Sequence, residues 1–298
     1  MPNDPSSGYR QASPGRGLLG RLLANPRILV AVGLALFAVI QYHLSTTKEE
    51  NAFTGDTVTV LKMSPEEETA LGLQSVPEMA QQFGGMVRDP AVARKIDEIG
   101  HRLLEAKERI VSKRGKQEGE FDYQFQFHVL ADRKTINAFA LPGGQVFITM
   151  ALLDKLPNED AVAGVLGHEI GHVLARHSIQ QMAKSGLLAG LVNAAVVATS
   201  DGTNNNSQIA QMVGQVVQTK YGREAESQSD RIGIQLLLEA GYKPEALLEV
   251  MKVLASTMNG ERPPEILSSH PFPETRAQQI EVYIDFFRKN GSDAQWKD

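Results

Sequence analysis

The feature that most constrains this chain is a pair of histidines, His168 and His172, with Glu169 directly after the first. Four residues make about one turn of an α-helix, so both imidazoles lie on one helix face and can reach a single metal ion. Glu169 points along the adjacent face, where its carboxylate can take a proton from an attacking water without occupying the metal. Apolar residues on both sides predict a rigid helix packed against a core. They are Val162, Val165, Leu166, Val173 and Leu174.

A catalytic zinc site needs a third protein ligand and an open position. The chain has no cysteine, so this ligand must be a histidine, an aspartate or a glutamate. Glu226 and Asp230 lie one helical turn apart in a charged downstream segment. We expect Glu226 to bind the metal and Asp230 to accept a hydrogen bond from the far nitrogen of a ligand histidine. Glu224, two residues off that face, is the weaker candidate, and a merely solvated helix face is the competing interpretation.

A second constraint is an apolar segment that has no polar side chain from residue 28 to 40 and extends to Leu44. As a helix it would reach about 25 Å, within the usual range for a membrane span. We therefore predict a transmembrane anchor at residues 28–44, preceded by a basic tail at residues 1–27. A cleaved signal peptide and a buried helix are the competing interpretations.

Charge indicates the orientation of this anchor. The first 44 residues carry a net charge of +3 and the rest of the chain carries −8. By the positive-inside rule the N-terminus stays cytoplasmic and the large domain lies on the other side, which in a bacterium is the periplasm. An arginine-rich leader also fits a mitochondrial presequence, and hence a mitochondrial inner membrane. The acidic body argues against nucleic acid as a partner.

The remaining pattern predicts a linker at residues 45–63 and one domain at residues 64–298. Alternating residues near 121–130 and two short strands around Pro142 predict a small antiparallel sheet. The apolar stretch at residues 186–199 is interpreted as a core helix in preference to a segment that dips into the membrane surface. Helices are expected after Ser64, after Asp89, from Asn158 to about His177, around Gln208, and at residues 222–240, 244–256 and 273–289.

Four groups of residues together resemble a known family. They are residues 137–144, residues 167–173 with Arg176 and His177, then Arg223 with Glu226 and Asp230, and finally His270 and Pro271 with Arg276. Over roughly residues 64–285 the chain resembles the membrane-linked zinc metallopeptidases that include the CAAX prenyl endopeptidases and the HtpX-type heat-shock proteases, family forty-eight of the metallopeptidases.

The resemblance implies an α+β, mainly helical, thermolysin-like (gluzincin) fold with one zinc ion per chain. It implies cleavage of peptide bonds in membrane-associated or misfolded envelope polypeptides. It nominates His270 or Arg276 to stabilise the charge that develops on the reacting carbonyl. It also suggests that the strand near residues 146–149 pairs with an extended substrate. The residues assigned to this substrate edge are Asn137, Phe139, Val146 and Ile148.

A single anchor points to the periplasmic branch of that family, which handles protein quality control in the outer envelope. The rival class is a chaperone or adaptor that binds unfolded membrane proteins, alone or together with protease activity. His270, in an irregular loop, is expected either to close the metal site as a fourth ligand or to stabilise the transition state. The competing interpretation is a surface histidine that caps the last helix. His177 lies off the ligand face, and a helix-capping or dipole role is expected for it.

Overall fold

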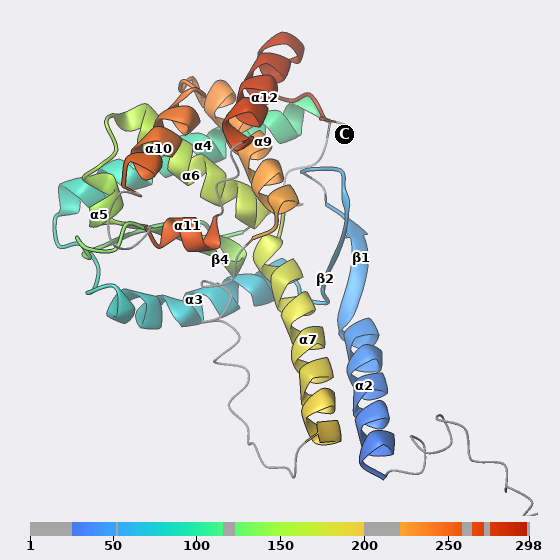
Figure 1. Ribbon diagram of the computed structural model, residues 1–298. Helices are drawn as coiled ribbons and strands as arrows, with labels where there is room; N and C mark the ends of the chain where they lie inside the picture. The colour runs from blue at the N-terminus through green and yellow to red at the C-terminus, as the bar shows by residue number, and fades with distance from the viewer. Residues whose placement is uncertain are drawn as a thin grey trace, which may run out of the picture. The chain divides into compact units, whose positions relative to one another are not determined.

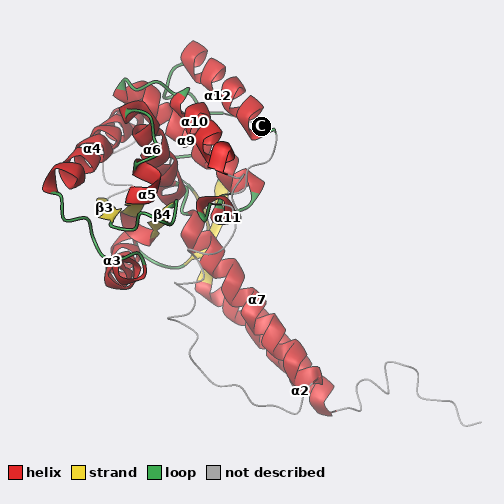
Figure 2. Ribbon diagram, turned by 60° about the vertical axis from the view of Figure 1, so that its left-hand side comes forward, coloured by secondary structure: helices red, strands yellow, loops and turns green. Residues whose placement is uncertain are grey.

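The computed structural model describes residues 26–51, 53–115, 123–199, 221–257, 264–270 and 275–296, with the backbone alone for residues 192–199. In these ranges the chain is mainly helical with two small sheets, as the sequence predicts (Figures 1 and 2). It divides into two compact units, Met1–Leu44 with Gly186–Asn206, and Ser45–Ser185 with Ser207–Asp298. The basic tail before residue 26 and the helix expected around Gln208 lie outside the described residues.

The smaller unit contains helix α2 (Pro26–Ser45) and the second half of helix α7 (His177–Thr199). In the described part of the chain, α2 is the one helix that is long and apolar enough to cross a membrane. Leu188 and Leu191 on α7 are 63% and 37% exposed. For residues 186–191, the prediction of a core helix is therefore wrong, because these leucines face outward.

The larger unit begins with an antiparallel hairpin of β1 (Thr46–Glu50) and β2 (Thr57–Leu61), where the sequence analysis predicted a linker. Val58 and Val60 are buried, alternate with the less buried Thr57 and Thr59, and pack against Ile179 at the start of α7. A linker is therefore the wrong description of these residues. The period-two pattern that favours a strand covers only five residues, too few to stand out.

Helices α3 (Pro65–Gln82) and α4 (Pro90–Lys113) begin at the predicted residues. The capping box at α3 is complete, since Glu67 donates its backbone N–H to Ser64 Oγ and the Ser64 N–H donates to the Glu67 carboxylate. At α4 the Asp89 carboxylate accepts from the Ala91 N–H at 2.8 Å. These local bonds satisfy N–H groups that the helix itself leaves unpaired.

The second sheet contains β3 (Gln126–Leu130), β4 (Ala138–Leu141) and β5 (Gln145–Thr149), in the spatial order β3-β5-β4. β4 and β5 are antiparallel neighbours joined by η1 (Pro142–Gly144), whereas β3 runs parallel to β5. The sheet is thus mixed, which corrects the antiparallel prediction. β5 is the central strand, so the expectation that residues 146–149 offer a free edge is also wrong. β4 is an edge strand of this sheet, and among the described strands it pairs with β5 alone.

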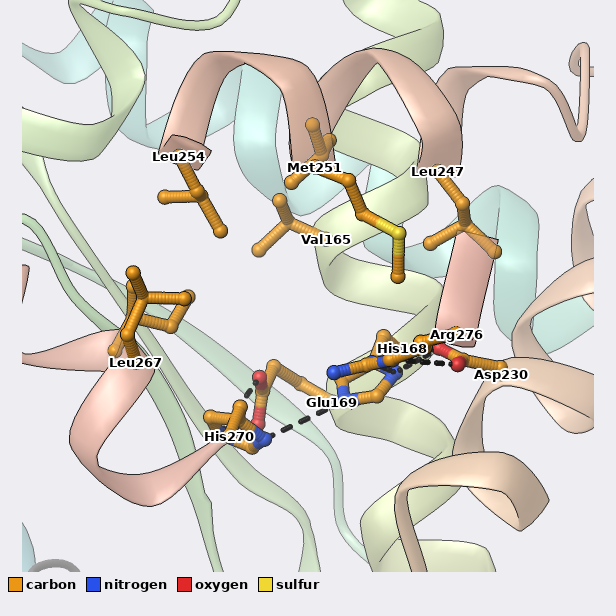
Figure 3. A pocket seen from close by; sticks show the side chains of 12 residues that line it. Val165, His168, Glu169, Asp230, Leu247, Met251, Leu254, Leu267, His270 and Arg276 are labelled. Carbon is orange, nitrogen blue, oxygen red and sulfur yellow. Dashed lines mark hydrogen bonds and ion pairs between the residues drawn. The ribbon is translucent and has the colours of Figure 1, made fainter. Parts of the chain in front are cut away.

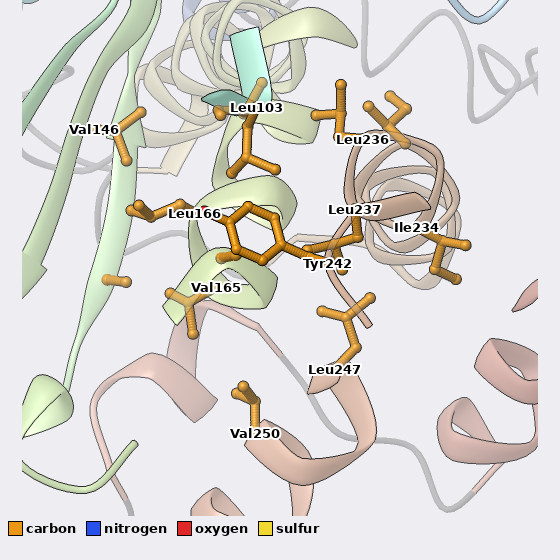
Figure 4. Close-up of a cluster of buried hydrophobic side chains, with 14 of the residues drawn as sticks. Leu103, Val146, Val165, Leu166, Ile234, Leu236, Leu237, Tyr242, Leu247 and Val250 are labelled. Atoms are coloured by element: carbon orange, nitrogen blue, oxygen red, sulfur yellow. The ribbon is translucent and has the colours of Figure 1, made fainter. Parts of the chain in front are cut away.

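The two faces of this sheet pack against different helices. Phe139, Leu141 and Phe147 form a cluster with residues of α3. Val146 and Ile148 point to the opposite face and join the main core beneath α6 (Glu159–Leu174). Figure 4 shows Val146 beside Leu166 of α6 and Leu103 of α4. The sheet therefore supports the helix that carries the histidine pair.

The rest of the unit contains α5 (Met150–Leu153), α9 (Arg223–Ala240), α10 (Ala246–Ser256), α11 (Ile266–Ser269) and α12 (Arg276–Asn290). α6 and α9 cross closely, since a Cβ placed on Gly171 would lie 2.9 Å from the Ser229 carbonyl oxygen. Only glycine permits this approach. The crossing brings the Glu226 and Asp230 face of α9 against the histidine face of α6.

Candidate metal centre

The three predicted ligands converge in the interior of the larger unit. His168, His172 and Glu226 are 7%, 1% and 2% exposed. One ligand atom from each, together with one from His270, lies within 4.8 Å of all the others. Two of these residues come from α6, one from α9 and one from the residue after α11. The cluster therefore depends on the crossing of α6 and α9.

Asp230 sets the tautomer of His168. Its Oδ1 lies 2.9 Å from His168 Nδ1, and Arg276 donates to both carboxylate oxygens at 2.7 and 2.8 Å. Burial opposes the charge on Asp230, but the guanidinium and its hydrogen bonds hold the pKa of Asp230 below its usual value. An ionised carboxylate can only accept, so His168 Nδ1 donates. His168 Nε2 is left with its lone pair directed at the cluster.

A second chain of hydrogen bonds sets the tautomer of His172. His177 Nε2 lies 2.8 Å from the side-chain oxygen of Gln228, whose amide nitrogen donates to Asp56 and so fixes the orientation of the amide. His177 is therefore protonated on Nε2, and its Nδ1 accepts from His172 Nδ1 at 2.9 Å. Burial lowers the pKa of His177 to about 4, which keeps the ring neutral. His172 Nε2 consequently carries a free lone pair, like His168 Nε2.

This role of His177 differs from the predicted cap or dipole partner, although the residue does lie off the ligand face. Its geometry depends on Arg176, whose φ of 56° turns the chain sharply between α6 and α7. Arg176 is held there by ion pairs with Glu49 and Glu68. Tyr221, also absent from the sequence argument, stacks on the His172 ring at 4.1 Å between centroids. No sequence pattern singles out Tyr221 or Gln228, because both act through long-range packing.

The donor set fits a zinc ion. His168 Nε2 and His172 Nε2 lie 3.1 Å apart with both lone pairs facing one another, and two bare lone pairs cannot share a hydrogen bond. Nitrogens bound to tetrahedral zinc are about 3.3 Å apart. A cation is therefore the group that satisfies this arrangement.

The carboxylate of Glu226 is suited to bind that cation. Burial disfavours its charge, but the charges of His270 and Arg276 and the hydrogen bond from His270 hold the pKa of Glu226 well below its usual range. Arg276 Nη1 lies 2.7 Å from Glu226 Oε2 as an ion pair. The rival ligand Glu224 has a side chain that is 75% exposed and pairs with Arg231 at 3.2 Å. The structure thus brings Glu226, and not Glu224, into the cluster.

Glu169 lies beside the cluster and is 1% exposed. Its burial raises its pKa, although the nearby His270 and His168 oppose that shift. His270 Nε2 is 3.6 Å from Glu169 Oε1, while His270 Nδ1 is 3.0 Å from Glu226 Oε1. His270 therefore stands between the ligand carboxylate and the carboxylate expected to act as base.

A pocket opens next to Glu169 (Figure 3). Its floor contains His168, Glu169, Asp230, His270 and Arg276, and its other walls are apolar. The apolar lining residues are Val165, Leu247, Val250, Met251, Leu254, Ile266 and Leu267. The apolar walls come from α6, α10 and the α11 segment, and α9 and α12 add Asp230 and Arg276. An apolar side chain can therefore be held directly beside the carboxylate.

A helix with two histidines and a buried glutamate, completed by a carboxylate from a second helix, defines the metallopeptidase class with a zinc-type ligand set. Within that class, residues 91–284 match the sequence model of peptidase family M48, and the chain belongs to that family. Metalloproteases of this family use zinc. The family, the metallopeptidase class and the zinc cofactor predicted from the sequence are thereby confirmed.

Three relatives illustrate the similarity. The chain is 30% identical over 202 residues to the beta-barrel assembly-enhancing protease of Escherichia coli (strain K12), over 64% of this chain and 38% of the relative. It is 30% identical over 191 residues to metalloprotease YcaL of the same strain, over 63% of this chain and 71% of the relative. It is 32% identical over 169 residues to the mitochondrial metalloendopeptidase OMA1 of Schizosaccharomyces pombe (strain 972 / ATCC 24843), over 56% and 48% respectively. The match thus spans less than half of two of these relatives.

Proposed function

We propose that this chain is a zinc-dependent endopeptidase that cleaves membrane-associated or misfolded envelope proteins. The observation that carries the proposal is the position of Glu169, a buried carboxylate between the ligand cluster and an apolar pocket. We further assign the arrangement to the thermolysin-like type, in which two histidines of one helix and a glutamate of another bind the metal.

His168, His172 and Glu226 would hold the zinc, which supplies Lewis-acid polarisation of the attacking water and of the scissile carbonyl. Glu169 takes the proton of that water and later delivers it to the leaving amine. In the observed position His270 would close the ligand set as a fourth member. Stabilisation of negative charge on the carbonyl oxygen is the alternative role for this residue. Arg276 does not stabilise the carbonyl oxygen in this scheme, because it forms ion pairs with Asp230 and Glu226. Its role is to orient the ligand residues.

The substrate backbone would add to the open edge of β4, whose other edge is paired with β5. Asn137, the residue before that strand, is 2% exposed, and among the described residues its side-chain oxygen has no hydrogen-bond partner. It can accept from a substrate N–H. Phe139 belongs to the same strand, whereas Val146 and Ile148 support it from β5. The apolar pocket then favours a large apolar substrate side chain next to the cleaved bond.

For localisation, we propose that α2 anchors the chain in the bacterial inner membrane with the larger unit in the periplasm. The positive charge of the first 44 residues supports this orientation, and relatives named beta-barrel assembly-enhancing protease fit it. A mitochondrial inner membrane is the alternative suggested by relatives named OMA1. Cleavage near Leu44, which would release a soluble periplasmic domain, is the other alternative.

The physiological role is tested by comparing the envelope proteomes of cells that carry the intact chain or Glu169→Gln. Substrates should accumulate in the variant and bind to it, because ligands and pocket are retained while the base is absent. If the variant instead restores the wild-type proteome of a deletion strain, the chain acts as a chaperone or adaptor and the protease proposal fails.

We predict that His270→Ala raises basal cleavage of casein and of the chain itself. In the observed position, His270 Nδ1 lies 3.4 Å from His168 Nε2 and 3.0 Å from Glu226, so the imidazole closes the ligand set as a fourth member. An open position is what a catalytic zinc requires. Initial rates with labelled casein measure the effect, and His101→Ala, at an exposed histidine of α4, is the matched control.

Two other outcomes would reassign His270. A fall of about 10 to 1,000-fold would make it a transition-state stabiliser and not a latch. Rates equal to those of the His101→Ala control would contradict both roles.

A further inference from the structure

We propose that residues 186–199, the second half of α7, lie in the lipid bilayer beside α2, so that the smaller unit is a two-helix membrane unit. The inference rests on the proposed membrane anchor and goes beyond it. It assigns the apolar surface of α7 to lipid hydrocarbon.

The sequence of α7 changes character along its length. Its first residues contribute to the larger unit, where Ile179 and Ala183 are 1% and 3% exposed. After Lys184 there is no charged side chain until Asp201. In this stretch Leu188 is 63% exposed. An apolar surface of this kind is costly in water and favourable in hydrocarbon.

The helix beside this stretch is the candidate membrane span. Figure 1 shows α2 and the second half of α7 side by side and running in opposite directions. A Cβ placed on Gly190 would lie only 2.6 Å from the Cβ of Ala38. Close approach through small residues is the usual way in which membrane helices associate.

The exposure pattern of α2 agrees with one protein-facing side. Its less exposed residues recur every three or four positions, as expected for the face that packs on a neighbouring helix. They are Ile28, Ala31, Ala35, Ala38 and Tyr42. The remaining surface is apolar and more than half exposed at Leu29, Val30, Leu36, Phe37 and Ile40. Lipid would therefore contact α2 on all sides but the one that α7 covers.

The register of the pair fixes the depth of α7. Gly190 lies opposite Ala38, and from there the two helices continue in opposite chain directions. The nine residues from Gly190 to Thr199 rise about 13 Å, and the ten from Ala38 back to Ile28 rise about 15 Å. The end of α7 thus reaches almost to the first residue of the apolar segment. If α2 crosses the bilayer, α7 lies within the bilayer for most of the same depth.

The chain contains no cysteine, so single cysteines can report the surroundings of each site. We would place an environment-sensitive fluorophore at Leu188→Cys and Leu191→Cys on α7. Phe37→Cys on α2 serves as the anchor reference, and Glu105→Cys, where the side chain is 71% exposed, as the aqueous reference. The full chain is reconstituted in vesicles of phosphatidylethanolamine and phosphatidylglycerol. Quenching is then compared between nitroxide-bearing lipids and aqueous iodide.

The inference predicts that both α7 sites behave like Phe37→Cys, quenched by the lipid nitroxide and not by iodide. Before labelling, they should react with a charged maleimide at least about tenfold more slowly than Glu105→Cys, because a charged reagent does not enter hydrocarbon. Iodide quenching at α7 alone overturns the inference and leaves the anchor intact. Iodide quenching at Phe37→Cys overturns the anchor proposal itself. Protection of α7 from both quenchers would assign its surface to another protein chain and also overturn the inference.

The contact between α7 and α2 can be tested separately by substituting one glycine in each helix. A Cβ on Gly190 would clash with Ala38, whereas a Cβ on Gly33 of α2 would meet nothing within 4 Å. Gly190→Leu should therefore lower the unfolding temperature of the full chain in detergent, and Gly33→Leu should not. Equal unfolding temperatures for the two variants would contradict the contact on which the depth of α7 depends.

Discussion

Glu169→Gln is expected to leave zinc bound and to reduce peptide-bond hydrolysis by at least about 10² to 10⁴-fold, the usual contribution of a general base. The amide has nearly the same shape as the carboxylate but cannot take a proton from water. Glu169 is outside the group of four ligand atoms, so its loss leaves His168, His172 and Glu226 in place. Metal analysis of the purified chain and initial rates of casein cleavage measure the two halves of this prediction.

The matched control for this change is Glu159→Gln on the same helix. Glu159 lies in the first turn of α6, pairs with Lys95 and has a side chain that is 40% exposed. Its neutralisation removes one charge from α6 without touching the cluster, so the rate should stay within about twofold of the wild type. Full casein cleavage by Glu169→Gln, or absence of zinc from the unmodified chain, would overturn the mechanism.

The parts of the fold that were predictable from sequence are those with local signals. Capping residues such as Ser64, Asp89 and Asn158 mark helix starts because their side chains bond to the N–H groups of the next turn. The histidine pair and the Glu226 and Asp230 pair are each defined by one helical turn. Gly241, with φ of 77°, ends α9 as its sequence position suggests.

The parts that were missed depend on partners far apart in the chain. In the parallel pairing of β3 with β5, Phe127 lies opposite Val146, although β4 comes between these two strands in the sequence. Short strands carry no local signal of which strand they pair with. The hairpin at residues 46–61 is stabilised by contact with Ile179. Exposure of residues 186–191 was missed because an apolar stretch of that length looks the same whether it enters a core or a bilayer.

Within the site, the same division holds. Sequence spacing identifies which residues share a helix face, but not which nitrogen of each histidine faces the metal. That choice depends on Asp230 for His168 and on the chain from Gln228 through His177 for His172. Local patterns therefore predict ligand identity, while ligand orientation requires the packed structure.

The loss of the third ligand is the second large effect that we expect. Glu226→Ala should lower zinc affinity by more than the about 10 to 100-fold that follows changes in groups that only orient ligands. Two imidazoles from one helix do not complete a catalytic zinc site. Glu224→Ala is the matched control, two residues away on the same helix but directed at Arg231 and solvent. Competition with a zinc chelator, followed by metal analysis, measures both variants.

A buried charge complicates the alanine variant, because Arg276 would lose one of its two carboxylate partners. Breaking one side of a buried ion pair destabilises a fold as well as a site. Glu226→Gln keeps the volume and one oxygen, so circular dichroism and the unfolding temperature of both variants separate lost folding from lost binding. Asp230→Asn should lower zinc affinity by about 10 to 100-fold, an effect between those of Glu224→Ala and Glu226→Ala. His168 would keep its place in this variant but lose its ionised acceptor. Equal zinc loss in folded Glu224→Ala and Glu226→Gln would mean that the metal is bound from the other face of α9.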